Sequence, residues 1–108
     1  MTKHGLTPNQ IESIAAILRP YAEKIKIVGL FGSRAKGTYR ANSDIDLAID
    51  GELSEEELER IYTLFDESQL PFKIDVNVLA LIDYQPLKEH IKTAFHPLLT
   101  QDDLRKNF

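Results

Sequence analysis

Residues 24–50 read KIKIVGLFGSRAKGTYRANSDIDLAID, and the order of patterns in this stretch decides the fold. Residues 24–32 are β-branched, apolar and too few for an unaided helix, so they predict a buried central strand. Residues 44–50 alternate between apolar and mainly acidic side chains, which is typical of a half-buried strand. Ala48 is expected to share the exposed face with the acids. The segment between the two strands is small and polar, and it predicts a loop.

Helix and strand signals also alternate through the rest of the chain. Thr7 and Ser54 each stand at the start of a capping box, which marks the beginning of a helix. The elements expected outside the opening stretch are helices over residues 8–23, 55–68 and 86–95, and a strand over residues 72–79. From about Gln101 the end is polar and is expected to be frayed. We therefore expect one α/β (α+β) domain over residues 1–108, with a small mixed β-sheet flanked by helices.

Composition limits the classes of function. The chain has no cysteine, which excludes disulfides and cysteine nucleophiles and suits a cytoplasmic location. A formal net charge of −4 and the absence of a dense lysine and arginine cluster disfavour direct nucleic-acid binding. No apolar run is long enough to span a membrane, and the first ten residues lack the apolar core of a signal peptide.

Three aspartates carry the strongest chemical signal. Asp44 and Asp46 lie two residues apart on a strand, so both side chains point to the same side about 7 Å apart. Asp75 lies on the polar face of the strand expected over residues 72–79. Carboxylates that converge in this way suit Mg²⁺, which prefers oxygen ligands and binds substrate phosphates. Solvated acids on an exposed sheet face are the alternative, and Asp50 is a weaker candidate at the end of its strand.

The loop after the first strand favours phosphate binding. Gly32 and Ser33 offer backbone N–H groups and a hydroxyl, and both suit phosphate oxygens. A Walker-type phosphate loop is rejected, because lysine followed by serine or threonine should come after Gly37, and Thr38 stands there instead. Arg34 and Arg40 are candidates for phosphate contacts or for simple solvation.

The two motifs GSRAKG, residues 32–37, and SDIDL, residues 43–47, resemble the signature of the DNA polymerase beta nucleotidyltransferase superfamily. The chain is similar in particular to the minimal nucleotidyltransferases of the MntA-like antitoxin class, over most of its length. The resemblance implies a polymerase-beta-like core. It also implies that Gly32, Ser33 and Arg34 bind the nucleotide, and that Asp44, Asp46 and Asp75 are catalytic and ligate Mg²⁺.

The resemblance implies an enzyme with a protein partner. It would transfer a nucleotide, with AMP from ATP as the expected case, to a hydroxyl. The acceptor is expected on a small helical HEPN-type protein, in a hetero-oligomeric toxin–antitoxin pair. One alternative is a non-catalytic nucleotide-binding antitoxin or assembly module. A drug-modifying transferase is disfavoured because the chain is short. The histidines and tyrosines give no comparable signal, and Tyr62 is expected in the core.

Overall fold

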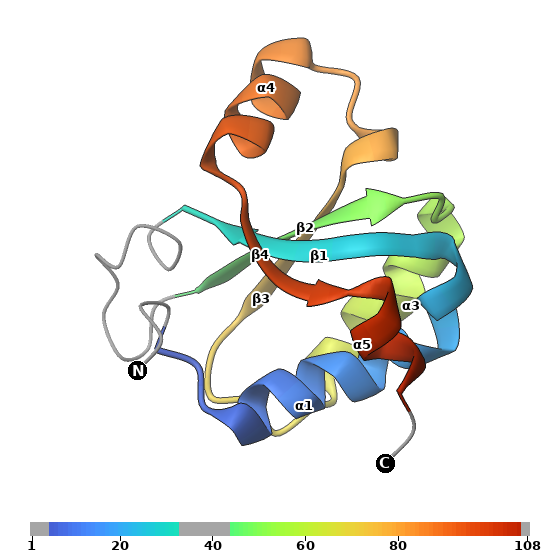
Figure 1. Ribbon diagram of the computed structural model, residues 1–108, viewed down its shortest axis with the longest axis vertical. Helices are drawn as coiled ribbons and strands as arrows, with labels where there is room; N and C mark the ends of the chain where they lie inside the picture. Colours follow the sequence, from blue (N-terminus) through green and yellow to red (C-terminus); the bar gives the residue numbers. More distant parts are fainter. Residues whose placement is uncertain (1–4, 33–43, 107–108) are drawn as a thin grey trace.

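The computed structural model describes residues 5–32 and 44–106. The sheet is formed by strands β1 Ile25–Phe31, β2 Ile45–Gly51, β3 Ile74–Val78 and β4 His96–Thr100. The helices are α1 Pro8–Leu18, α3 Glu55–Asp66, α4 Gln85–Ala94 and α5 Gln101–Arg105, with 3-10 turns η1 Arg19–Lys24 and η2 Leu79–Leu81. Figure 1 shows α4 on the opposite side of the sheet from α1, α3 and α5.

The sheet is mixed, with strand order β3-β2-β1-β4. Strand β1 pairs antiparallel with both β2 and β4, whereas β2 and β3 are parallel. The two most apolar strands therefore occupy the two central positions. This arrangement confirms the predicted mixed sheet flanked by helices.

One face of the sheet is closed by a hydrophobic core. Val28 and Leu30 of β1 and Leu47 and Ile49 of β2 are fully buried on this face, together with Ile14 of α1. The capping boxes predicted at Thr7 and Ser54 are both present, so the helices that cover this face begin where the sequence indicates. The opposite face is left to α4 and to the acidic side chains.

The first helix is shorter than predicted. We expected it to continue to about Glu23, but α1 ends at Leu18 and the chain continues as the 3-10 turns of η1. Pro20 explains the change, because proline has no N–H for an α-helical bond and its ring clashes with the carbonyl four residues earlier.

The expectation of a frayed end is wrong. His96–Thr100 adds the strand β4, and Gln101–Arg105 forms α5 with Leu104 fully buried. Pro97 obscures this strand in the sequence, since proline cannot donate to a ladder and is confined to edges or bulges. In the structure β4 is an edge strand, and its pairing with β1 is irregular between Val28 and Gly29, next to Pro97.

The prediction that Ala48 lies on an exposed face is also wrong, since its side chain is fully buried. Ala48 pairs with Gly29 of β1. A Cβ on Gly29 would lie 2.3 Å from the ring of Phe95, so this ring rests directly on the glycine. The residue after α4 therefore covers the middle of the second face, and two exposed areas remain on either side of it.

Candidate active site

Two carboxylates meet at one end of the face that carries α4. Asp46 and Asp75 are direct partners in the parallel pairing of β2 with β3, so their side chains emerge on the same face of neighbouring strands. Strands in a sheet lie about 4.8 Å apart, and like charges placed directly opposite destabilise a sheet. This pairing is therefore unfavourable unless opposite charge lies near the two carboxylates.

The pKa of Asp46 is shifted by burial and by the neighbouring acids. Burial raises the pKa of the Asp46 carboxyl above its ordinary value, and the neighbouring Asp75 and Asp44 carboxylates raise it further. Both effects disfavour the charged form, and neither is offset by a hydrogen bond to this carboxylate among the described residues. A cation between the acids would reverse this penalty, because opposite charge favours the ionised carboxylate.

Gly32 stands against the same carboxylate. It has a φ of 78°, a conformation that L residues with side chains rarely adopt. A Cβ at this position would lie 2.5 Å from Oδ2 of Asp46. The backbone of Gly32 therefore lies as close to the Asp46 carboxylate as a glycine allows.

Tyr62 is a site residue that the sequence reasoning missed. Tyr62 packs against the hydrophobic core, as expected, and its hydroxyl lies 2.8 Å from Oδ1 of Asp75 and 3.0 Å from the carbonyl oxygen of Val76. It also accepts a hydrogen bond of 2.9 Å from the Val76 N–H. Burial raises the pKa of Tyr62, and the bond to Asp75 raises it further, so the hydroxyl stays protonated and can donate to the carboxylate.

The hydroxyl reaches Asp75 from the edge of the sheet. Tyr62 belongs to α3, which packs on the core side, whereas Asp75 points to the other side from the edge strand β3. In the sequence, Tyr62 only follows Ile61 on the apolar side of the predicted helix. That position fits a half-buried tyrosine at a sheet edge as well as a tyrosine in the core.

Of the remaining predicted site residues, the structure describes only some. Asp44 directly precedes β2 and is exposed, and it lies close enough to contribute to the raised pKa of Asp46. Ser33, Arg34 and Arg40 lie outside the described residues. Within residues 5–32 and 44–106, no group of three His, Asp or Glu side chains is arranged to hold a metal ion as it stands. The described acids therefore form a pair, Asp46 with Asp75, with Asp44 beside it.

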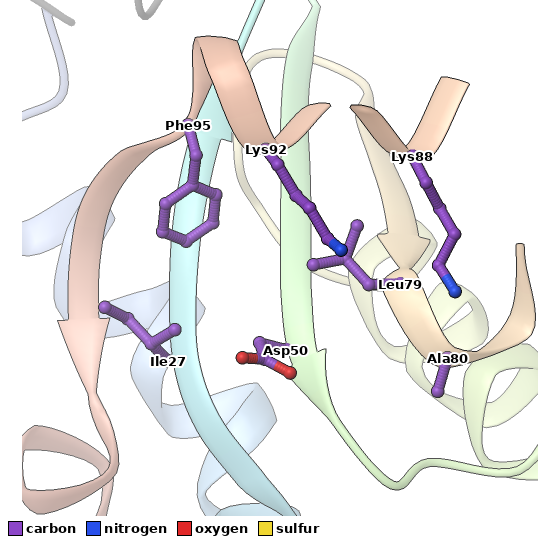
Figure 2. A pocket seen from close by; sticks show the side chains of 7 residues that line it. All are labelled: Ile27, Asp50, Leu79, Ala80, Lys88, Lys92 and Phe95. Carbon is purple, nitrogen blue, oxygen red and sulfur yellow. The ribbon is translucent and has the colours of Figure 1, made fainter. Parts of the chain in front are cut away.

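A cavity of about 480 Å³ opens farther along the same face, under α4. Its floor is formed by Ile27 of β1 and Asp50 of β2, which are paired in the sheet. The residues that complete its lining are Leu79, Ala80, Lys88, Lys92 and Phe95 (Figure 2). Asp50 thus belongs to this cavity and is separate from the Asp46–Asp75 pair.

Paired acids beside a glycine turn, on a mixed sheet with helices behind it, are an arrangement that suits nucleotidyl-transfer domains. The sequence pattern of the family described as "Polymerase beta, Nucleotidyltransferase" matches residues 12–104. The chain therefore belongs to the polymerase beta nucleotidyltransferase family, and its fold is that of the MntA-like minimal members.

Solved structures agree with this assignment. A chain in "Crystal structure of the toxin-antitoxin with AMP-PNP" is 27% identical at a TM-score of 0.68, and the match covers 88% of this chain and 80% of that one. A chain in "Crystal structure the toxin-antitoxin MntA-HepT" has the same fold at 24% identity and a TM-score of 0.60, covering 88% and 77%. No curated protein matches this chain. In the described part of the chain, no helix combines the length and apolar character that crossing a membrane requires.

Proposed function

We propose that this protein is the antitoxin of a toxin–antitoxin pair and transfers AMP from ATP, with Mg²⁺, to a hydroxyl of a helical HEPN-type partner. The observation that carries the proposal is the in-register pair Asp46 and Asp75 beside Gly32. The family supplies the reaction class of nucleotidyl transfer. The solved toxin–antitoxin with AMP-PNP, which is 27% identical to this chain, supports an adenine nucleotide as the donor and a toxin–antitoxin pair as the setting.

The donor atoms fit a magnesium ion. Mg²⁺ prefers carboxylate and phosphate oxygens and commonly binds one or two carboxylates together with a substrate's phosphates. Asp46 and Asp75 would hold it, with Asp44 as a further ligand. When bound, the ion would neutralise charge on the phosphate oxygens and on the leaving group.

The residues of this chain have distinct tasks in the proposed reaction. The acceptor hydroxyl oxygen forms a bond to the α-phosphorus, and the bond from that phosphorus to the bridging oxygen breaks, so that pyrophosphate leaves. The proton of the hydroxyl passes to a carboxylate oxygen of Asp75. Gly32 and Ser33 would hold the departing phosphates with backbone N–H groups and a hydroxyl. Tyr62 would keep Asp75 oriented through its hydrogen bond.

Labelled ATP tests the proposal. The protein and Mg²⁺ are added to a lysate of the source cells with ATP labelled on the α-phosphate or on the γ-phosphate. The Asp46→Asn variant runs beside each reaction, and Asp102→Asn, which changes an exposed acid on α5 away from this face, serves as a matched control. We expect only the α-label on a discrete acceptor, with wild type and Asp102→Asn alike and Asp46→Asn inactive. Transfer of γ-label, or equal transfer by Asp46→Asn, would refute nucleotidyl transfer at this site.

A non-catalytic antitoxin remains the second candidate. The described residues hold a converging pair of acids without a preformed three-residue metal cluster, which is compatible with nucleotide-dependent docking alone. The two candidates differ in one measurement, which is growth rescue of cells that carry the toxin partner. Asp46→Asn should lose rescue if transfer neutralises the toxin and should keep it if contact alone is sufficient.

A further inference from the structure

The cavity under α4 is lined by two lysines, although the chain as a whole is acidic. Lys88 and Lys92 are one helical turn apart on α4, so both side chains extend from the same face of the helix. Figure 2 shows both side chains extending from α4 into the region of the cavity, with the Lys92 ammonium group beside Leu79 and the Lys88 ammonium group on the side of Ala80. Among residues 5–32 and 44–106, neither ammonium group has an ion-pair partner, although the whole chain carries a net charge of −4. The two lysines outnumber the single carboxylate of the lining, that of Asp50, so the cavity has a net positive charge that favours an anionic ligand.

The cavity also lies on the acceptor side of the proposed reaction. In an in-line displacement, the attacking and leaving oxygens stand on opposite sides of the phosphorus. In the proposed reaction pyrophosphate leaves toward Gly32, where β1 ends. The acceptor then approaches from the side away from Gly32. The cavity lies on the same face, away from Gly32 along β2, and Asp50 in its floor is about 13 Å from Asp46 at the usual rise per residue of a strand.

The surroundings of the cavity favour a polypeptide ligand. Its walls include the apolar side chains of Ile27, Leu79 and Phe95, and its volume of about 480 Å³ is enough for several side chains. Tyr84 and Leu87, at the start of α4, are 68% and 37% exposed and are the large hydrophobic side chains most open to solvent in the described chain. Aromatic and apolar side chains of this kind are typical of the centre of a protein interface. A nucleic acid would instead favour a broad basic surface, whereas the sequence carries a formal net charge of −4.

We propose that this cavity is the acceptor subsite, an inference that rests on the proposed function. It binds an acidic segment of the partner next to the hydroxyl that receives the nucleotide. Lys88 and Lys92 bind the carboxylates of that segment, and Phe95, Leu79 and Ile27 contact its apolar atoms. The target hydroxyl then lies toward Asp75. Specificity for the acceptor would thus come from α4, whereas the nucleotide is held at the other end of the same face.

Peptide binding tests this proposal without catalysis. The probes are fluorescent peptides with a central tyrosine flanked by glutamates or by lysines, and a single-stranded oligothymidylate. Anisotropy is measured without ATP or Mg²⁺ for wild type, Lys88→Gln/Lys92→Gln and the matched control Lys26→Gln/Arg60→Gln. The control removes the same charge at exposed positions outside the cavity. Thermal unfolding verifies that each variant folds.

We expect the glutamate peptide to bind wild type and the control alike, and the α4 variant about tenfold or more weakly. The lysine peptide should not bind. Equal affinity in the two double variants, or binding of the lysine peptide, would overturn the proposal. Lysine-dependent binding of the oligothymidylate alone would overturn it in favour of a nucleic-acid acceptor.

The same variants separate this proposal from the proposed function. If nucleotidyl transfer fails its own test but the glutamate peptide still binds through Lys88 and Lys92, the function is wrong and the acidic-segment site stands. If transfer occurs, the α4 variant should raise the KM for the acceptor without changing the affinity for ATP. An unchanged acceptor KM would then overturn the subsite while leaving the function intact.

Discussion

At the scale of single residues, the site contains charges whose placement lowers the stability of the fold. Asp46 and Asp75 face each other across two strands, and Asp46 is partly buried with a raised pKa. Gly32 accepts a left-handed conformation so that the backbone can pass close to Asp46. Strained or repelling residues that gather at one point are typical of functional sites, where stability is sacrificed for binding.

Asp46→Asn should therefore stabilise the metal-free protein while abolishing transfer. The substitution removes a repelling, partly buried charge that accepts no hydrogen bond from the described residues. We expect a gain of about 0.5 kcal/mol, or roughly 2–4 °C in the unfolding midpoint at neutral pH with chelator present. Thermal unfolding of both proteins measures it. A clear loss of stability would mean that Asp46 supports the fold, and that its repulsion by Asp75 is unimportant.

Tyr62→Phe should reveal a positioning role. The variant keeps the ring but removes the hydroxyl that contacts Asp75 and the backbone of Val76. Loss of a partner for the Val76 N–H should cost about 1 kcal/mol of stability. We expect kcat to fall about tenfold with little change in the KM for ATP, and the Mg²⁺ concentration for half-maximal rate to rise. Thr63→Ala, a neighbouring hydroxyl on α3 outside the site, is the control. Unchanged kcat and Mg²⁺ dependence in Tyr62→Phe would restrict Tyr62 to a structural role.

At the scale of elements, capping chemistry and periodicity were enough to predict most of the fold. Thr7 and Ser54 begin their helices as predicted, because a capping box is a local signal that needs no tertiary contact. Strand β4 could not be predicted, since Pro97 argues against a strand unless its position at the sheet edge is known. The Asp46–Asp75 pair follows from alternation on two strands, but their register and the approach of Tyr62 depend on tertiary packing.

Helix α5 gives a prediction of pH dependence. Asp103 and Thr100 form its capping box, and the hydrogen bond from the Thr100 N–H lowers the pKa of Asp103 below the ordinary value of 3.8. A lowered folded pKa means that the contribution of Asp103 is complete above this ordinary value and is lost as the pH falls through the lower one.

Asp103→Ala should therefore lower the free energy of unfolding by about 1 kcal/mol at pH 7. The difference from wild type should shrink as the pH falls below 4. Urea unfolding across this range measures it, with the exposed neighbour Asp102→Ala as control. A difference that stays constant into acid would show that the carboxylate charge plays no part in the cap.

At the scale of the whole molecule, the two faces of the sheet have separate tasks. The helices α1, α3 and α5 bury one face and stabilise the fold, whereas the other face presents the acids, Gly32 and the cavity under α4 (Figure 1). The contact between Phe95 and Gly29 separates the acid pair from the cavity. This division keeps the charges of Asp46, Asp75 and Asp50 away from the core.

Gly29→Ala should disturb α4 more than the core. The new methyl group would meet the Phe95 ring at 2.3 Å and the His96 carbonyl oxygen at 2.8 Å, so the segment after α4 must move. Overpacking of this kind costs about 1–3 kcal/mol. Hydrogen exchange should become faster in α4 and β4 and stay unchanged in α1 and α3. The double variant Gly29→Ala/Phe95→Leu should recover part of the loss. Uniformly faster exchange in all helices would show that α4 is not a separate layer.

The most direct test of the central claim is calorimetric binding of a non-hydrolysable ATP analogue, with and without Mg²⁺. We compare wild type, Asp46→Asn, Asp75→Asn and the control Asp50→Asn, which changes an acid on the same face in the other area. We expect Mg²⁺-dependent binding by wild type and Asp50→Asn, and at least about tenfold weaker binding by the other two variants. Equal affinity in all four proteins, or binding that does not depend on Mg²⁺, would contradict it.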